Sequence, residues 1–253
     1  MSMLETLAKN AAFVCISLVV VAFFTLIAVA FERAVRSTSN DRERILSTRR
    51  IVFIGLFSAI AAILFCLDFP VFFAPVFYKM DFSELPALIG AFAYGPVTGV
   101  MIEFIKILIK LCIKGTSTAF VGELANFMVG VSFVLPASVF YHFRKTRKTA
   151  IVSCVLGTLC MTVFGAVFNA VYLLPAFSAL FGMPMEAIIE MGSKINGAIT
   201  DVTTFVILAV APLNLLKGGA VSLITVLVYK RLSSVMKARE SHKEENGGAS
   251  VGD

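Results

Sequence analysis

Long apolar runs separated by short polar segments dominate this chain of 253 residues. A helix needs about 20 apolar residues to cross about 30 Å of hydrocarbon. Runs that approach or exceed this length cover Ala11–Phe31, Ile51–Leu67, Ala119–Phe143 and Ala150–Leu174. Another run, Phe82–Ile113, is too long for one crossing, and Tyr94-Gly95-Pro96 divides it into two helices. The first of these begins near Ser83, a residue type that caps helix N-termini.

Prolines decide the interpretation of two further segments. The segment Asp68–Asp81 contains two prolines and many aromatic residues, so we expect an ordered loop there. The run Val202–Tyr229 is longer than a bilayer requires and contains Pro212. We expect the final span to begin at Pro212, because a proline in the first turn removes no helical hydrogen bond. The preceding residues, Ala176–Ala211, then form a long connection with a short helix near Glu186–Lys194.

Composition and charge place the chain in a membrane. It is 58% hydrophobic and 15% charged, whereas soluble domains are about 45–50% apolar and about 25% charged. The net charge of +6 would be compatible with nucleic-acid binding in a soluble protein. Here, however, 15 of the 22 basic residues follow or precede predicted spans on one side, within 33–50, 144–148 and 230–243. Basic residues mark the cytoplasmic side, so the charge reflects membrane topology and no nucleic-acid partner is predicted.

The same topology divides the chain into three parts. Residues 1–49 form an extra N-terminal transmembrane helix and an Arg-rich cytoplasmic linker, with the extreme N-terminus outside the cell. Residues 50–232 form a six-helix transmembrane bundle whose two ends are cytoplasmic. Residues 233–253 are rich in Gly, Ser and Glu, which predicts a disordered cytoplasmic tail. The fold class is therefore an all-α membrane protein with six bundle helices and one added helix.

Several kinds of chemistry are not indicated by the sequence. The five cysteines lie in apolar runs without a C-x-x-C pair, and the two histidines stand beside basic clusters. This pattern predicts neither a metal site nor a catalytic residue. The sequence also lacks the G-x-x-x-x-G-K-[ST] phosphate loop, so any ATP hydrolysis belongs to a partner.

Ionisable residues inside a span are functional candidates, since each costs roughly 2.5–3.5 kcal/mol on insertion scales. Glu103, Lys106 and Lys110 share one helix face at i, i+3 and i+7. One interpretation is a self-neutralising ion pair, with Lys110 reaching the outer interface. The other places Lys106 against a ligand or against Glu123.

Further polar residues lie near the outer ends of separate spans: Glu123, Asn126, Asn169, Tyr172, Asn214 and Lys217. Chance hydrogen bonds between helices would explain any one pair. They do not explain convergence at one depth beneath an aromatic loop. The pattern outlines a site for a neutral, hydroxyl-rich ligand with an aromatic part.

Five segments resemble the riboflavin-specific substrate-binding subunits of energy-coupling factor (ECF) transporters. The similarity covers about Arg50 to Leu232 in order and with the expected spacing. The strings are Lys79-Met-Asp-Phe-Ser-Glu-Leu-Pro-Ala87, Tyr94-Gly-Pro-Val-Thr-Gly99, Glu123-Leu-Ala-Asn-Phe127, Asn169-Ala-Val-Tyr-Leu-Leu-Pro175 and Ala211-Pro-Leu-Asn-Leu-Leu-Lys-Gly218.

The resemblance implies a six-helix bundle in a bacterial cell membrane that holds riboflavin in an outward cavity. Riboflavin is then a transported ligand and not a cofactor. By motif position, the residues that hydrogen-bond the flavin or its ribityl chain are Asn169, Asn214 and Lys217. The remaining polar contacts come from Asp81, Glu123, Asn126 and Tyr172, and the apolar wall comes from Tyr78, Met80 and Phe82.

The resemblance also implies protein partners: a transmembrane coupling protein and two cytoplasmic ATPases. Family members carry small residues on the first bundle helix for docking, supplied here by Gly55/Ala59 and Ser58/Ala62. Such pairs let helix backbones approach closely. The added segment 1–49 departs from the family pattern, either as a plain membrane anchor or with a role in regulation or assembly. As an anchor, it is dispensable for folding and flavin binding.

Two other classes of function stay open at this point. A self-sufficient secondary transporter would couple flavin entry to protons through Glu103 or Glu123. A membrane enzyme acting on lipid or flavin would need a catalytic set, and the sequence offers none that is convincing.

Overall fold

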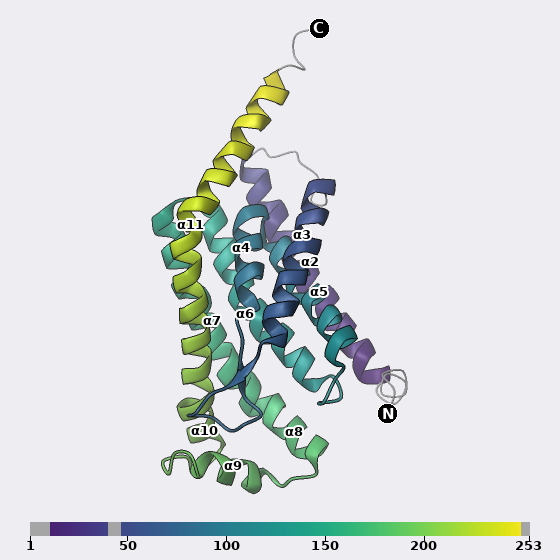
Figure 1. Cartoon of the computed structure of the whole chain (residues 1–253), viewed down its shortest axis with the longest axis vertical. Coiled ribbons are helices and arrows are strands. Elements are labelled where there is room, and N and C mark those ends of the chain that lie inside the picture. The colour runs from purple at the N-terminus through teal and green to yellow at the C-terminus, as the bar shows by residue number, and fades with distance from the viewer. Residues whose placement is uncertain (1–10, 40–46, 249–253) are drawn as a thin grey trace.

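The computed structural model describes residues 11–39 and 47–248, with side chains up to Tyr229 apart from those of residues 36, 38 and 39. Long helices run side by side to form a bundle, and a further helix lies obliquely against it (Figure 1). The bundle helices are α3 (Thr48–Cys66), α4 (Glu84–Tyr94), α5 (Pro96–Lys114), α6 (Val121–Phe143), α7 (Arg147–Phe168) and α11 (Ala211–Gly248). The added helix is α2 (Ala11–Ser39), which packs on α5 and α6. The expected fold class is confirmed.

Five helical segments of the described chain are long and apolar enough to cross a membrane: Ala11–Val35, Thr48–Cys66, Val121–Phe143, Arg147–Phe181 and Val202–Tyr229. The helix α4 is apolar but shorter, and α5 carries the charged residues noted above. Between them, Gly95 adopts φ +112°, a conformation that L side chains rarely adopt, and Pro96 opens α5. The predicted break at Tyr94-Gly95-Pro96 is therefore confirmed.

The segments that connect α3 with α4 and α7 with α11 are ordered and lie at one end of the bundle. Strands β1 (Phe69–Pro70) and β2 (Lys79–Met80) pair antiparallel, with Phe69 opposite Met80. They form the predicted ordered loop between α3 and α4. The short helices at the same end are α8 (Leu174–Phe181), α9 (Met185–Ser193) and α10 (Val202–Phe205). The N-terminal end of α2 also points to this end (Figure 1). The helix expected near Glu186–Lys194 is α9.

The expected start of the final span at Pro212 is wrong. Helix α10, the π-helix η2 (Val206–Val210) and α11 follow one another without a break, so the proline lies inside a continuous helix. The wider π turn before Pro212 makes room for its ring, and local readjustment of this kind lets membrane helices accept prolines. The other π-helix, η1 (Asn169–Leu173), precedes Pro175 with the same spacing, and α8 then continues the helix beyond the expected end at Leu174.

The expected disorder of residues 233–253 also differs from the structure. Helix α11 continues through this segment to Gly248, although its composition is polar. Residues 249–253 lie outside the described part of the chain. Starting a helix is costly, but extending an existing one is not, so α11 can continue into a polar segment. The composition of residues 233–253 taken alone does not include this effect.

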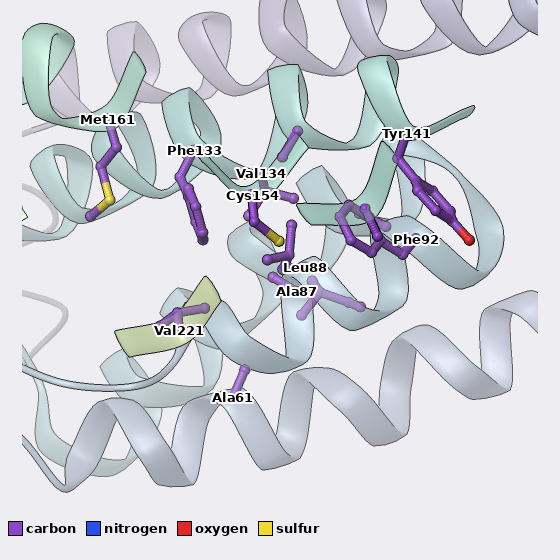
Figure 2. Close-up of a cluster of buried hydrophobic side chains, with 14 of the residues drawn as sticks. Ala61, Ala87, Leu88, Phe92, Phe133, Val134, Tyr141, Cys154, Met161 and Val221 are labelled. Atoms are coloured by element: carbon purple, nitrogen blue, oxygen red, sulfur yellow. The ribbon is translucent and has the colours of Figure 1, made fainter. Parts of the chain in front are cut away.

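The part of the bundle around Phe92, Tyr141 and Tyr229 has a closely packed apolar core. Figure 2 shows side chains from several bundle helices meeting there, including Phe92 and Tyr141, whose stacked ring centroids are 4.3 Å apart. The Tyr141 hydroxyl lies 3.1 Å from the Tyr229 hydroxyl, which satisfies the polar ends of both rings. Small residues such as Ala61 and Ala87, both fully buried, let α3 and α4 approach each other. This core holds the helices that carry the outer polar residues.

A buried ion pair ties α2 to the bundle. Arg50 at the start of α3 donates from both terminal nitrogens to the Glu32 carboxylate at 2.6 and 2.8 Å. Its Nε also donates to Thr98 Oγ1 at 2.6 Å. Arg50 is 1% exposed and Glu32 3%, so this arginine, which the sequence analysis counted among the basic residues of 33–50, is part of the core. The added helix is thus packed into the bundle through a specific polar contact.

Candidate functional site

The loop 68–82, which contains β1 and β2, contributes two side chains that contact separate helices. The Tyr78 hydroxyl donates to Asn169 Oδ1 at 2.6 Å, and Lys217 Nζ donates to Asp81 Oδ2 at 3.0 Å. Asn169 lies in η1 and Lys217 lies in α11. The loop thereby joins two of the helices on which the sequence predicts ligand contacts.

The Asn169 amide is hydrogen-bonded on both sides. Its Nδ2 donates to the backbone carbonyl of Gly165 at 2.7 Å, while Oδ1 accepts from Tyr78. Burial raises the pKa of the Tyr78 phenol, so this group stays neutral and remains a donor at physiological pH. Asn169 is the first residue of the π-helix η1, and its two hydrogen bonds fix the orientation of the amide.

Asp81 is held as a carboxylate by its surroundings. Its Oδ1 accepts from the Ser83 backbone N–H at 2.8 Å, and its Oδ2 accepts from Lys217. Burial opposes ionisation, but the ammonium groups of Lys217 and Lys106 and the hydrogen bonds from Ser83 together hold the pKa of Asp81 below its ordinary value. Asp81 therefore supplies a fixed negative charge beside Lys217.

Asn214 is the clearest candidate for a ligand contact. It lies three residues before Lys217 on α11 and is 6% exposed. Its Nδ2 is buried and has no hydrogen-bond partner among the described residues. The amide lies directly against Gly165, where a Cβ atom would collide with it. A buried unpaired donor costs about 1–3 kcal/mol, so this group is poised for an acceptor that the chain itself does not supply.

Lys217 connects Asp81 with a charge cluster whose central member, Glu84, the sequence analysis did not select. Its Nζ lies 2.8 Å from Glu84 Oε1, and Lys106 Nζ lies 3.4 Å from the same oxygen. Lys106 also lies 2.6 Å from Glu103 Oε2, so the ion pair that one interpretation favoured is present. Glu84 stands in the Ser-Glu-Leu-Pro string of the first motif, which was the available signal.

The expected capping role of Ser83 is wrong. Its side chain makes no capping hydrogen bond to α4, and its Oγ accepts from Lys106 Nζ at 2.7 Å instead. A charged donor makes a stronger hydrogen bond than a backbone N–H, which explains why the hydroxyl turns towards the lysine.

Glu123 belongs to a separate polar cluster. Its carboxylate accepts from Lys110 Nζ at 2.6 Å and from the hydroxyls of Thr116 and Thr118 at 3.0 and 3.1 Å. The lysine that faces Glu123 is thus Lys110 and not Lys106, because Lys110 lies nearer the C-terminal end of α5, which is followed by the start of α6. Lys110 therefore forms an ion pair with Glu123, whereas the sequence analysis expected it to reach the membrane–water interface.

The remaining predicted contacts differ in their surroundings. Asn126 Oδ1 is buried without a hydrogen-bond partner among the described residues, one turn along α6 from Glu123. Tyr172 is partly exposed and its ring packs beside Phe168, with centroids 5.2 Å apart. Met80 is buried in a second apolar cluster, which also contains Leu174 and Phe205. Phe82 packs against both this cluster and the core around Phe92. The ligand roles of all four residues stay predictions.

A hollow of about 370 Å³ lies between α2, α5 and α6. Its lining is apolar apart from a serine and Glu123, and it includes Val14, Leu18, Phe104, Leu108 and Phe127. It lacks the amides and the lysine that would orient a hydroxyl-rich ligand, so it is distinct from the candidate site.

The expected docking residues on α3 divide into two groups. Gly55 and Ala59 are exposed, and a Cβ at Gly55 would meet nothing within 4 Å. Ser58 and Ala62 are fully buried against the other bundle helices. The Ser58/Ala62 pair therefore packs within the bundle and offers no exposed surface for docking. The role of Gly55 and Ala59 stays a prediction.

Within the described residues, no group of three or more His, Cys, Asp or Glu side chains is arranged to hold a metal ion. The site offers amides, a phenol, a lysine and carboxylates beneath an aromatic loop. These groups are suited to hydrogen-bonding a ligand between apolar walls.

Comparisons with known proteins identify the family to which the chain belongs. Residues 49–229 match the family described as "ECF transporter, substrate-specific component". The chain is 30% identical to the riboflavin transporter FmnP of Bacillus subtilis over 197 residues, covering 78% of this chain and 98% of the relative. It is 29% identical to the riboflavin transporter RibU of Staphylococcus aureus, with 75% and 93% covered.

A solved structure described as the S component of a bacterial ECF transporter is also similar. It aligns with a TM-score of 0.58 at 30% identity and covers 75% of this chain and 98% of that chain. The relatives thus match the bundle almost from end to end, while the matched family region begins after α2.

Proposed function

Because the chain belongs to the substrate-specific components of ECF transporters, we propose that it binds riboflavin and mediates its uptake into the bacterial cell. Its relatives are transporter components and not enzymes, and the chain is a multi-pass bacterial membrane protein. Riboflavin is accordingly a transported substrate and not a cofactor.

The observation that carries this proposal is the buried, unpaired Nδ2 of Asn214 beside Lys217. Riboflavin combines a flat aromatic ring system that bears carbonyl and ring-nitrogen acceptors with a chain of hydroxyl groups. An acceptor on this ligand would satisfy the Asn214 donor. Lys217 and Asn169 would then hold the flavin or its ribityl chain, with Met80 and Phe82 against the ring.

Binding on this account requires an exchange of hydrogen bonds. Tyr78 and Asp81 now occupy Asn169 and Lys217. The ligand would replace or share these contacts, so the loop 68–82 would report on whether the site is filled. The exchange conserves hydrogen bonds, which keeps the energetic cost of opening the loop small.

Titrating riboflavin into the purified protein while following flavin fluorescence tests the proposal. Asn214→Ala should weaken binding about tenfold, because a ligand acceptor would lose its buried partner, about 1–3 kcal/mol. Asn196→Ala, which alters an exposed loop amide, is the matched control and should bind normally. Unchanged affinity in Asn214→Ala would move the site elsewhere.

We further propose that a transmembrane coupling protein and two cytoplasmic ATPases energise uptake, with Gly55 and Ala59 on the docking face. Gly55→Leu with Ala59→Leu should leave binding intact and abolish uptake, since the added bulk stands on an exposed helix face. Gly219→Leu, at another exposed glycine with open space, is the control. Uptake by the double variant at the normal rate would disprove this docking face. Uptake that persists after ATP depletion at constant membrane potential would instead indicate a secondary transporter.

The positions of the basic clusters support an orientation with both ends of the bundle in the cytoplasm and the extreme N-terminus outside. Labelling a cysteine introduced at Lys145 with a membrane-impermeant thiol reagent checks this orientation in intact cells, where labelling from outside would reverse it.

A further inference from the structure

Five buried charged side chains form one connected set of ion pairs that includes Lys217. Its members are Asp81, Glu84, Glu103, Lys106 and Lys217. The Lys217 ammonium lies 3.0 Å from Asp81 and 2.8 Å from Glu84. The Lys106 ammonium lies 3.4 Å from Glu84 and 2.6 Å from Glu103. Glu84 thus links the two lysines. With all five side chains charged, three carboxylates face two ammonium groups.

The neighbouring elements do not supply the missing positive charge. On α5 and α6, Lys110 and Glu123 neutralise each other at 2.6 Å. From α3, the Phe65 ring lies 5.5 Å from Lys106 Nζ, and on α6 the backbone of Gly130 lies against the Glu103 carboxylate. Among the described residues, no third cation contacts the set.

Two carboxylate oxygens in this set are unpartnered. Glu84 Oε2 and Glu103 Oε1 are buried and accept no hydrogen bond from the described residues. Both residues are at most 1% exposed. An uncompensated charge in such surroundings is expensive, and burial favours the neutral form of a carboxyl group. A proton removes the excess charge and turns one oxygen into a donor. A bound metal ion is a poorer solution, because the two ammonium groups would repel it.

We propose that the Glu84–Glu103 pair holds one proton, which makes the buried set of Asp81, Glu84, Glu103, Lys106 and Lys217 electrically neutral. The proton comes from the medium and returns to it, so no other reactant is involved. In this state Lys217 is shared between Asp81 and Glu84 without an excess of negative charge around it.

The proton also affects the ligand site, a consequence that rests on the proposed riboflavin binding. Loss of the proton would leave one net negative charge beside Lys106 and Lys217. The lysine would then be drawn more strongly towards the carboxylates and would be less available to a neutral ligand. Riboflavin affinity should therefore fall as pH rises. Glu103→Gln leaves two carboxylates facing two ammonium groups, which is neutral without a bound proton, and should remove this dependence.

Infrared spectroscopy of the full-length protein without ligand tests the proton directly. Exposed carboxyl groups are ionised at about pH 7, since their pKa values are near 4. A carboxylic acid carbonyl band that shifts on transfer to D₂O is expected for the wild type. Glu103→Gln should abolish or displace this band, whereas Glu190→Gln, which alters an exposed carboxylate on α9, should leave it unchanged.

Absence of the band in the wild-type protein would overturn the proposal, and so would its persistence, unshifted, in both Glu84→Gln and Glu103→Gln. The wild-type spectrum requires no variant to fold and no ligand to bind, so it stands apart from the test of riboflavin binding. In the binding arm, wild-type affinity should fall severalfold between about pH 6 and about pH 9, with a flat profile for Glu103→Gln. A flat wild-type profile would show that the proton is not coupled to the ligand.

Discussion

Two buried ionic clusters lie towards opposite ends of the bundle, and they differ in how completely their members are paired. At the start of α3, Arg50 and Glu32 match one to one, and Thr98 receives the remaining Nε–H. Near the start of α11, Lys217 belongs to a set with an excess carboxylate, unpartnered oxygens and a neighbouring unpaired amide. The two clusters are therefore similarly buried, but only the Arg50 cluster has its hydrogen-bonding groups fully paired.

The difference separates a structural contact from a candidate binding contact. A fully paired cluster has nothing further to offer a ligand, and breaking it leaves a buried charge without compensation. An incompletely paired cluster has groups that a proton or a ligand can satisfy. Burial alone would not have distinguished them.

The largest expected effect comes from breaking the paired cluster. A chain shortened to begin at Arg44 loses Glu32 and the packing of α2 on α5 and α6, and it leaves Arg50 without its carboxylate. Together these losses should cost about 3–5 kcal/mol of stability. From the sequence we expected residues 1–49 to be dispensable for folding. The buried Arg50–Glu32 ion pair changes that expectation. Thermal unfolding in detergent measures the effect.

A second substitution makes this test specific. Arg50→Met in the shortened chain removes the unpaired charge and should restore much of the lost stability, because apolar residues often replace buried ion pairs without loss. A shortened chain as stable as the full-length protein would show that the Glu32–Arg50 contact contributes nothing.

A smaller effect is expected from Gly165→Ala beside the incompletely paired cluster. The added methyl would displace the Asn214 amide, which should weaken riboflavin binding by about fivefold, or about 1 kcal/mol. Gly219→Ala places the same methyl on an exposed position of α11 where nothing lies within 4 Å. Riboflavin titrations of both variants should differ, and equal affinities would show that Asn214 does not contact the ligand.

Much of the fold follows from hydrophobic run length, which predicts the helices because the bilayer requires apolar segments of a given span. Pro212 shows where this reasoning fails. A proline reads as a helix start from local rules, but a π turn formed in the tertiary structure accommodates it inside the helix. The stop at Leu174 fails for the same reason at Pro175.

The candidate site shows a similar limit. Asn169, Asn214 and Lys217 could be selected because polar groups in spans are costly, and the structure places all three near the loop 68–82 or one another. Their partners could not be selected, because pairing depends on helix rotation. A capping role was expected for Ser83, and Arg50 was counted with a basic flank of the spans, yet both side chains turn inward to charged partners.

The most direct test of the account compares riboflavin affinity in one substitution from each cluster. Lys217→Met removes a proposed ligand contact and should weaken binding about tenfold or more. Glu32→Gln disturbs the paired cluster and should lower stability while the folded protein binds riboflavin with wild-type affinity. Fluorescence titration at matched folded concentrations supplies both values. Wild-type affinity in Lys217→Met, or an equal loss in Glu32→Gln, would contradict the assignment of the ligand site to the incompletely paired cluster.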